Sequence, residues 1–204
     1  KEPVGSMGND APLAVLSDQA PLLFGYFKQH FAQVSNPPLD AIREELVTSM
    51  EAFIGAEGNL FDETAAQCRR LKLNEPVLTN HDLEKIKALD LPGLRSTTLS
   101  ALFRPADGPG ALESAVKDLC EQASQAVEDG FSIIVLSDRG VDSEHAPIPS
   151  LLATAGVHHS LIREGTRTQV GLVVESGEPR EVAHFALLFG YGAGAVNAYL
   201  AFET

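Results

Sequence analysis

The stretch that decides the fold is residues 131–141, Phe-Ser-Ile-Ile-Val-Leu-Ser-Asp-Arg-Gly-Val. Its centre, residues 133–136, holds four consecutive apolar residues, three of them β-branched. This composition predicts a strand buried on both faces, as the strands of parallel sheets are. The run ends at Ser137, and Asp138 and Arg139 follow directly. The pattern therefore places two opposite charges at the carboxyl end of a buried strand, where α/β folds usually bind their ligands.

Helix and strand patterns alternate on both sides of this strand. Amphipathic helical patterns cover residues 112–129 and 149–163, and a second buried strand pattern covers residues 168–175. The other predicted elements are a helix to residue 89 capped by Thr79 or Asn80, a strand over residues 96–103, a helix over residues 181–189 and a short strand at residues 195–196. Right-handed crossovers allow these strands to pair in parallel, in a barrel or in an open sheet.

The amino-terminal part of the chain is less regular. Residues 13–17, Leu-Ala-Val-Leu-Ser, predict a short strand, and residues 41–46 predict a helix that Asp40 is placed to cap. Between them, Pro37 and Pro38 fix two backbone φ angles and remove two N–H donors. We therefore expect a stiff, extended segment there.

Composition limits the possible classes of function. The chain has 204 residues, 44% of them hydrophobic, and a mean hydropathy of +0.01. These values suit one sizeable α/β domain, or most of a larger one. The net charge of −13 argues against a nucleic-acid or membrane partner, because such surfaces need clusters of positive charge. No apolar run approaches the ~20 residues of a membrane span.

The two cysteines indicate the cellular compartment of the protein, and the first residues indicate where the given sequence starts. Cys68 and Cys120 lack the spacing of a redox or metal motif, and a disulfide framework would need more cysteines. A reducing, cytoplasm-like compartment is therefore predicted. The first residues, Lys-Glu-Pro-Val-Gly, contain neither an initiating Met nor a hydrophobic signal segment. We interpret this start as a cut inside a longer chain.

Three charged residues form the best candidate site. Asp138 and Arg139 end one predicted strand and Glu175 ends the next, so they belong to one rim of the sheet. One interpretation is a structural ion pair that orients the following loop. The other is acid–base chemistry by two carboxylates and an arginine. The sequence offers no nucleophile–base pair, phosphate-binding loop or metal cluster beside them.

Two further motifs have structural interpretations. Residues 190–194, Gly-Tyr-Gly-Ala-Gly, follow a predicted helix and precede a strand, which is the reverse of the dinucleotide-binding order. We interpret them as a helix stop and a tight turn. His158 and His159 would point about 100° apart on a helix, and with His184 they lack metal-ligand spacing. Core or groove positions are predicted for these histidines.

Several long stretches resemble the central domain of the glutamate synthase large (alpha) subunit. The resemblance runs the length of the chain and is carried mainly by residues 2–17, 31–40, 136–141, 147–153, 173–182 and 190–197. In that family, the enzyme makes two glutamates from glutamine and 2-oxoglutarate. An amidotransferase domain releases ammonia, and a domain with FMN and an iron–sulfur cluster uses it. The resemblance implies that these two domains of the same chain are the partners of the central domain.

The family's central domain is an incomplete or degenerate β/α barrel, TIM-like and of the FMN-oxidoreductase type, with mostly parallel strands and no cofactor. It also supplies part of the wall of the ammonia tunnel. The positions that match the family's tunnel segment are Ser35, Asn36, Pro37, Pro38, Leu39 and Asp40. A stiff diproline segment suits a channel wall.

The resemblance also implies how this chain is organised. We expect a single domain over residues 1–204, with a loop and helix segment over residues 1–60 and βα repeats over residues 94–204. A helical segment of the family domain would precede Lys1. We expect the chain alone to be non-catalytic, without a cofactor or metal of its own, and to be cytoplasmic, or plastid in a plant-type enzyme. The alternative is a stand-alone α/β enzyme or ligand-binding module that uses the charged rim.

Overall fold

The computed structural model describes residues 13–27, 41–59 and 61–204. The chain divides into two compact units, Lys1–Met50 and Glu51–Thr204. The charged rim predicted from the sequence lies in the second unit, and the residues matched to the tunnel segment belong to the first.

The described part of the first unit consists of short helical segments. They are two 3-10 helices, Ala14–Leu16 and Leu23–Phe27, and the α-helix α1, Ala41–Val47. The strand predicted over residues 13–17 is therefore wrong. The N–H of Leu16 donates to the carbonyl of Leu13 at 3.0 Å, which closes a helical turn. Periodicity alone does not separate a short apolar strand from such a turn. The helix predicted over residues 41–46 is confirmed, and its predicted cap, Asp40, lies outside the described residues.

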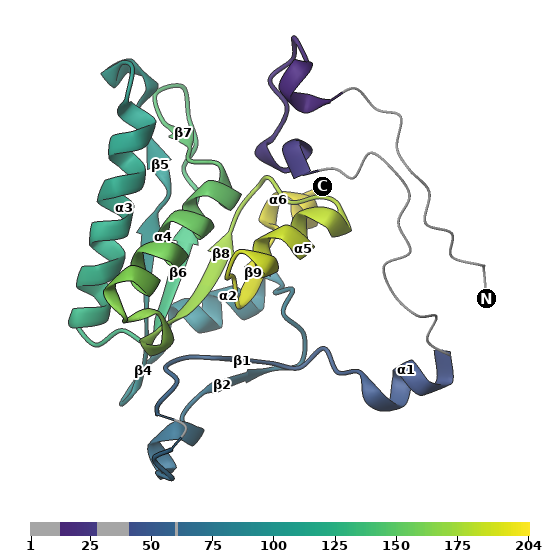
Figure 1. Cartoon of the computed structure of the whole chain (residues 1–204), viewed down its shortest axis with the longest axis vertical. Coiled ribbons are helices and arrows are strands. Elements are labelled where there is room, and N and C mark those ends of the chain that lie inside the picture. The colour runs from purple at the N-terminus through teal and green to yellow at the C-terminus, as the bar shows by residue number, and fades with distance from the viewer. Residues whose placement is uncertain (1–12, 28–40, 60) are drawn as a thin grey trace. The chain divides into compact units, whose positions relative to one another are not determined.

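A five-stranded sheet lies at the centre of the second unit, with the strand order β3-β4-β6-β8-β9 (Figure 1). Its strands are β3 (Asp90–Leu91), β4 (Leu94–Ser100), β6 (Ile133–Ser137), β8 (Gly171–Glu175) and β9 (Ala195–Asn197). Strands β4, β6, β8 and β9 pair in parallel, and β3 at one edge is antiparallel. The parallel strands predicted from the sequence are confirmed, within a mixed α/β fold.

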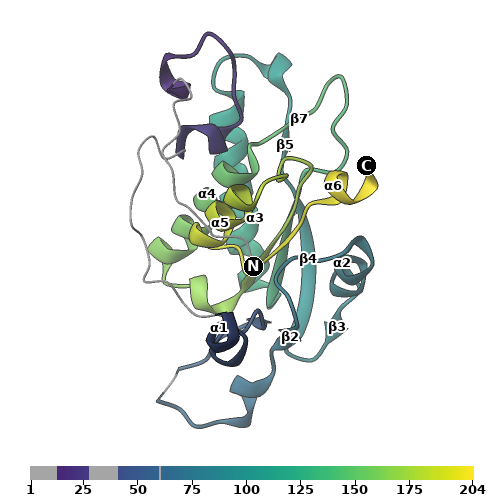
Figure 2. The ribbon, with the colours of Figure 1, turned by 90° about the vertical axis from the view of Figure 1, so that its right-hand side faces the viewer.

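Helices connect the parallel strands. The helices of this unit are α2 (Asn80–Lys87), α3 (Ala111–Glu128), α4 (Ser150–Glu164), α5 (Val182–Gly190) and α6 (Tyr199–Glu203). The helices predicted over residues 112–129 and 149–163 are confirmed as α3 and α4, within one residue at each end. Helices α3, α4 and α5 lie side by side on the same side of the sheet, and α2 lies on the other side (Figure 2).

Strand β6 is buried on both faces, as its sequence predicts. Ile134 and Leu136 pack into the core beneath α3 and α4. Ile133 and Val135 pack into a second core with residues of α2. Alternate side chains of a strand point to opposite faces, so a sheet covered on both sides requires an uninterrupted apolar run. All four side chains are 0–2% exposed.

Two small antiparallel sheets complete the unit. One pairs β1 (Ala52–Ile54) with β2 (Leu71–Leu73), and the other pairs β5 (Leu102–Phe103) with β7 (Ala146–Pro147). Ile54 is 1% exposed and belongs to the same core as Ile133 and α2. The first small sheet therefore helps α2 to cover the second face of the main sheet.

Two predicted strands have different bounds in the structure. The strand predicted over residues 96–103 is two strands, β4 and β5, in separate sheets. Ala101 lies between them: its N–H donates to the carbonyl of Ser137, and its carbonyl accepts from the N–H of Ile148. The side-chain alternation continues through this exchange of partners, so the sequence does not show it. The strand predicted over residues 168–175 is β8, and it begins at Gly171 because Arg167–Gln169 form a 3-10 turn.

Helix α2 is capped as its sequence predicts. The hydroxyl oxygen of Thr79 accepts a hydrogen bond from the N–H of Asp82 at 3.2 Å.

We expect Thr79→Ala to lower the free energy of unfolding by about 1 kcal/mol, because one N–H at the helix start loses its acceptor. Urea unfolding of the chain measures the change. Thr79→Ser keeps the hydroxyl and should stay near the wild-type value, and an equal loss in both variants would contradict the capping role.

No helix in the described ranges is both long enough and apolar enough to cross a bilayer.

Candidate functional site

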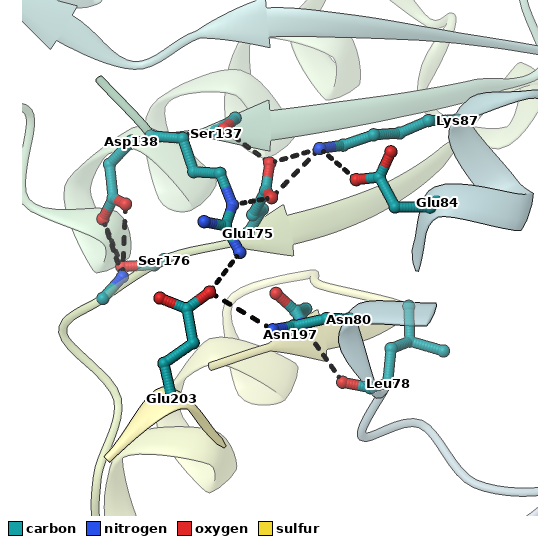
Figure 3. A network of polar contacts seen from close by, with 12 residues as sticks. Leu78, Asn80, Glu84, Lys87, Ser137, Asp138, Glu175, Ser176, Asn197 and Glu203 are labelled. Atoms are coloured by element: carbon teal, nitrogen blue, oxygen red, sulfur yellow. Dashed lines mark hydrogen bonds and ion pairs between the residues drawn. The ribbon is translucent and has the colours of Figure 1, made fainter. Parts of the chain in front are cut away.

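Polar residues end three neighbouring strands at one edge of the main sheet. Ser137 is the last residue of β6, Glu175 of β8 and Asn197 of β9. Parallel strands bring their carboxyl ends to the same edge, so the three side chains gather although they are far apart in the sequence. All three residues are at most 6% exposed. We call these residues, with Arg139 and Lys87, the strand-end network (Figure 3).

Glu175 lies at the centre of the strand-end network, and its side chain is 0% exposed. One carboxylate oxygen accepts from the Nε of Arg139 at 2.6 Å. The other accepts from the hydroxyl of Ser137 at 2.6 Å and lies 2.8 Å from the Nζ of Lys87. The buried carboxylate is thus held by two cations and a hydroxyl, which offsets the cost of its desolvation.

The network continues from Arg139 to helix α6. The Nη2 of Arg139 lies 3.0 Å from a carboxylate oxygen of Glu203, which also accepts from the side-chain amide of Asn80 at 3.3 Å. The guanidinium of Arg139 lies 4.0 Å from the ring centre of Tyr199, a cation–π contact. These contacts attach α6 to the ends of β6 and β8.

Asp138 belongs to a separate cluster. Its carboxylate accepts from the hydroxyl of Ser176 at 2.5 Å and from the N–H of Gly177 at 3.2 Å. Of the three residues predicted from the sequence, Arg139 and Glu175 are therefore in direct contact, whereas Asp138 points to the loop that follows β8.

Burial and hydrogen bonding shift the pKa values of these groups in different directions. Burial alone would raise the pKa of Glu175, but its contacts with Lys87, Ser137 and Arg139 outweigh burial, and the pKa is lowered. Burial raises the pKa of Asp138 in spite of its hydrogen bonds. Burial and the neighbouring Asp138 carboxylate raise the pKa of the Tyr199 hydroxyl.

The opposite shifts at Glu175 and Asp138 predict opposite effects on stability. Glu175, with a lowered pKa, contributes stability that is complete above its usual value of 4.5 and is lost as the pH falls through the folded-state value. Asp138, with a raised pKa, contributes stability below its usual value of 3.8 that is lost as the pH rises through the folded-state value.

Urea unfolding between about pH 3 and about pH 7 tests these signs. Wild type should lose more stability on acidification than Glu175→Gln, because only wild type has a paired carboxylate to protonate. Asp138→Asn should lose more stability than wild type on acidification, because it lacks the carboxyl group whose raised pKa stabilises the fold at low pH. If the free energy of unfolding depended on pH in the same way in all three proteins, both pKa shifts would be contradicted.

One small cavity of the described residues adjoins the strand-end network. The cavity beside Asp138, Glu175 and Ser176 has a volume of about 10 Å³. This is at the lower limit for one water molecule. Glu175 is occupied by Arg139 and Lys87, and Asp138 by Ser176 and Gly177. The geometry therefore favours the structural interpretation of the rim over acid–base chemistry.

Sequence reasoning missed Lys87 and Asn197. The amide of Asn197 donates to the carbonyl of Leu78 and to the side chain of Asn80, both at 2.9 Å, and so joins β9 to the start of α2. A polar residue directly after the apolar pair 195–196 was a usable signal, because Ser137 and Glu175 follow the same rule. Lys87 had no such signal, since its partner lies 88 residues away.

The histidines have separate partners. The Nδ1 of His158 accepts from the Nε of Arg167 at 2.8 Å, and the ring contacts that of His159 edge-on. Burial, then the charge of Arg167, lowers the pKa of His158. The Nδ1 of His184 accepts from the N–H of Arg180 at 3.1 Å. No cluster of three or more histidine, cysteine, aspartate or glutamate residues in the described ranges could hold a metal ion.

The residues matched to the tunnel segment, residues 35–40, lie outside the described part of the chain. Their assignment as tunnel wall stays a prediction from the resemblance.

Comparison with known proteins gives a match over the whole chain. The family model described as "Glutamate synthase central domain" matches residues 1–204. Among curated proteins, the chain is 52% identical over 204 residues to the glutamate synthase [NADPH] large chain of Bacillus subtilis (strain 168). It is 46% identical over 206 residues to the glutamate synthase [NADH] of Schizosaccharomyces pombe and 45% identical over 206 residues to the ferredoxin-dependent glutamate synthase of Pyropia yezoensis.

Each of these alignments covers 100% of the chain but only 10–13% of the relative. The chain thus corresponds to a small part of much longer proteins.

Proposed function

The chain belongs to the glutamate synthase central-domain family, and from this premise we propose that it is a scaffold between two catalytic domains of a glutamate synthase. The match of the family model to residues 1–204 carries the proposal. The proposed partners are an amidotransferase domain that releases ammonia from glutamine and an FMN domain that uses it with 2-oxoglutarate. By the same resemblance we place the protein in the cytoplasm, or in the plastid for a plant-type enzyme.

The names of the relatives support a role that does not depend on the electron donor. The proteins named for NADPH, NADH and ferredoxin all match the full chain, at 52%, 46% and 45% identity. A segment that selected the donor would be expected to differ most between these types. We therefore propose that this domain serves a step common to all of them.

Topology supports a degenerate β/α barrel for the fold. The order β4-α3-β6-α4-β8-α5-β9 places successive parallel strands side by side with their connecting helices on one side of the sheet. A β/α barrel is wound this way, whereas a doubly wound sheet has helices on both sides. Here α2 and Ile54 cover the face that would line the barrel interior. We propose that they fill the space that further strands enclose in a complete barrel.

The residues present do not suit the family's two cofactors. Iron–sulfur clusters are usually held by three or four cysteine thiolates, and the sequence has two cysteines, Cys68 and Cys120, on separate elements. At the carboxyl edge of the strands, where a β/α barrel would hold a flavin, the cavity that the described residues form beside Asp138 and Glu175 has a volume of about 10 Å³, which is too small for a flavin. We propose that FMN and the cluster are bound by other domains.

The strand-end network supports the scaffold proposal. It joins β6, β8, α2 and α6 through contacts with Glu175, Arg139 and Lys87. A rigid junction between two reaction centres requires such fixed geometry.

Arg139→Ala tests the alternative, a ligand-binding rim. If the chain is a scaffold, the variant should lose stability alone. If the rim binds a ligand, the variant should lose the ligand-binding signal.

Coupling between the two reactions tests the tunnel assignment. In the full-length protein, we expect Pro37→Gly combined with Pro38→Gly to release ammonia into solution, because a flexible segment no longer holds the channel wall. Glutamine hydrolysis would then exceed glutamate formation from 2-oxoglutarate. The measurement is free ammonia per glutamate formed. Pro109→Gly, in an exposed loop, is the matched control and should leave the ratio unchanged. Unchanged coupling in the double variant would remove these prolines from the tunnel wall.

A further inference from the structure

A second cavity lies at the opposite edge of the main sheet from the strand-end network. It has a volume of about 330 Å³ and adjoins Gly171, the first residue of β8, and Gly194, just before β9. That volume is large enough for several water molecules or for a small organic group. It lies within the range of ligand-binding pockets. We call it the arginine cavity, because Arg70 and Arg167 both line it.

Arg167 brings a positive charge to the arginine cavity without a carboxylate partner among the described residues. Its three nitrogens donate to neutral acceptors: the Nδ1 of His158 at 2.8 Å, the carbonyl of Val170 at 2.6 Å and the carbonyl of Gly192 at 2.8 Å. Each terminal nitrogen carries two N–H groups, so each has one donor left. Burial lowers the pKa of Arg167, against the opposing effect of Glu57. The guanidinium is thus fixed in place by neutral acceptors, and no carboxylate of the described residues is in direct contact with it.

Arg70 adds a second guanidinium that is incompletely satisfied. Its Nη2 donates to a carboxylate oxygen of Glu57 at 2.8 Å and to the carbonyl of Phe53 at 2.9 Å. Its Nε is buried and has no hydrogen-bond acceptor in the described part of the protein. Its Nη1 has no hydrogen bond to the described residues, so its N–H groups are the donors that remain for a ligand.

The charges that line the arginine cavity do not cancel. Arg70 and Arg167 contribute two positive charges, and Glu57, which also lines the cavity, contributes one negative charge. The surplus of one positive charge occurs in a chain whose net charge is −13. Guanidinium groups bind carboxylates and phosphates with paired N–H donors, and free donors on both arginines suit such a group.

We propose that the arginine cavity binds a small oxyanion, a carboxylate or a phosphate group, through the free terminal N–H groups of Arg70 and Arg167. The site is separate from the strand-end network, since the two lie at opposite ends of β8. It is also independent of the proposed scaffold role.

Anion binding to the full-length protein tests this proposal. Isothermal titration calorimetry is done with acetate and with inorganic phosphate, at ionic strength held constant with chloride. We expect Arg70→Gln to weaken binding about tenfold or more, because a charged donor at the ligand is lost. Arg69→Gln is the matched control: it removes the same charge from the adjacent, exposed residue, which does not line the cavity. Its affinity should stay within about twofold of wild type.

A second variant should strengthen binding, which misfolding would not do. Glu57 competes with the ligand for Arg70, and its side chain is 52% exposed, so Glu57→Gln should leave the fold intact. We expect this variant to bind the anion about two- to fivefold more tightly. The anion that binds, acetate or phosphate, identifies the class of group. No binding of either anion to wild type, or equal affinity in wild type, Arg70→Gln and Glu57→Gln, would overturn the proposal.

Discussion

Replacing Glu175 by alanine should destabilise the 204-residue chain by about 3 kcal/mol. The substitution leaves Arg139 and Lys87 facing each other without the carboxylate that holds both. Removing one partner of a buried ion pair typically costs about 3–5 kcal/mol. The lower end is expected because Arg139 is 40% exposed and Lys87 is 21% exposed, so both can turn partly to water. The midpoint of urea unfolding, at neutral pH, measures the effect.

Glu203→Ala is the matched control for this prediction. Glu203 contacts the same arginine at 3.0 Å, but its side chain is 46% exposed. Exposed ion pairs contribute about 0–1 kcal/mol, so this variant should lose at most about 1 kcal/mol. Similar losses in the two variants would mean that burial of Glu175 is not what makes its contacts important.

Gly192→Ala should also be strongly destabilising, by about 3 kcal/mol. Gly192 has a φ of +111°, a conformation that residues with a side chain rarely adopt. A Cβ at this position would overlap the imidazole ring of His158. His158 is held in turn by Arg167, so the ring has little freedom to move away. Backbone strain and overpacking thus add to each other, and thermal or urea unfolding measures the sum.

Gly190→Ala provides the control two residues away. Gly190 is the last residue of α5, has no positive φ, and an added Cβ would meet no atom within 4 Å. Alanine favours helices by up to about 1 kcal/mol over glycine, so this variant should be neutral or slightly more stable than wild type. A loss at position 190 as large as that at position 192 would exclude the proposed conflict with His158.

Much of the fold could be predicted because its signals are local. The apolar run 133–136 indicated a strand buried on both faces, and the helical stripes on either side indicated the crossovers. The strand predicted at residues 13–17 failed because five residues are too few to separate a strand from a helical turn. The break at Ala101 was invisible because it is a change of hydrogen-bond partner, without a change in side-chain pattern.

The candidate site was only partly predictable. Asp138, Arg139 and Glu175 were identified because each directly follows or ends a buried strand. The contacts among these three residues could not be predicted, because the direction of a side chain at a strand end depends on its neighbours. Arg139 turned to Glu175, while Asp138 turned to Ser176.

The sequence by itself determined the family and the succession of parallel strands and helices, because both depend on patterns within contiguous stretches of residues. Only the tertiary structure decided that Lys87 completes the contacts of Glu175, and that Arg70 and Arg167 line one cavity. The partners in each of these pairs are far apart along the chain, and their distance in space is fixed by how strands and helices pack. A pattern in the sequence records which face of an element is buried, but not which distant side chain is packed against it.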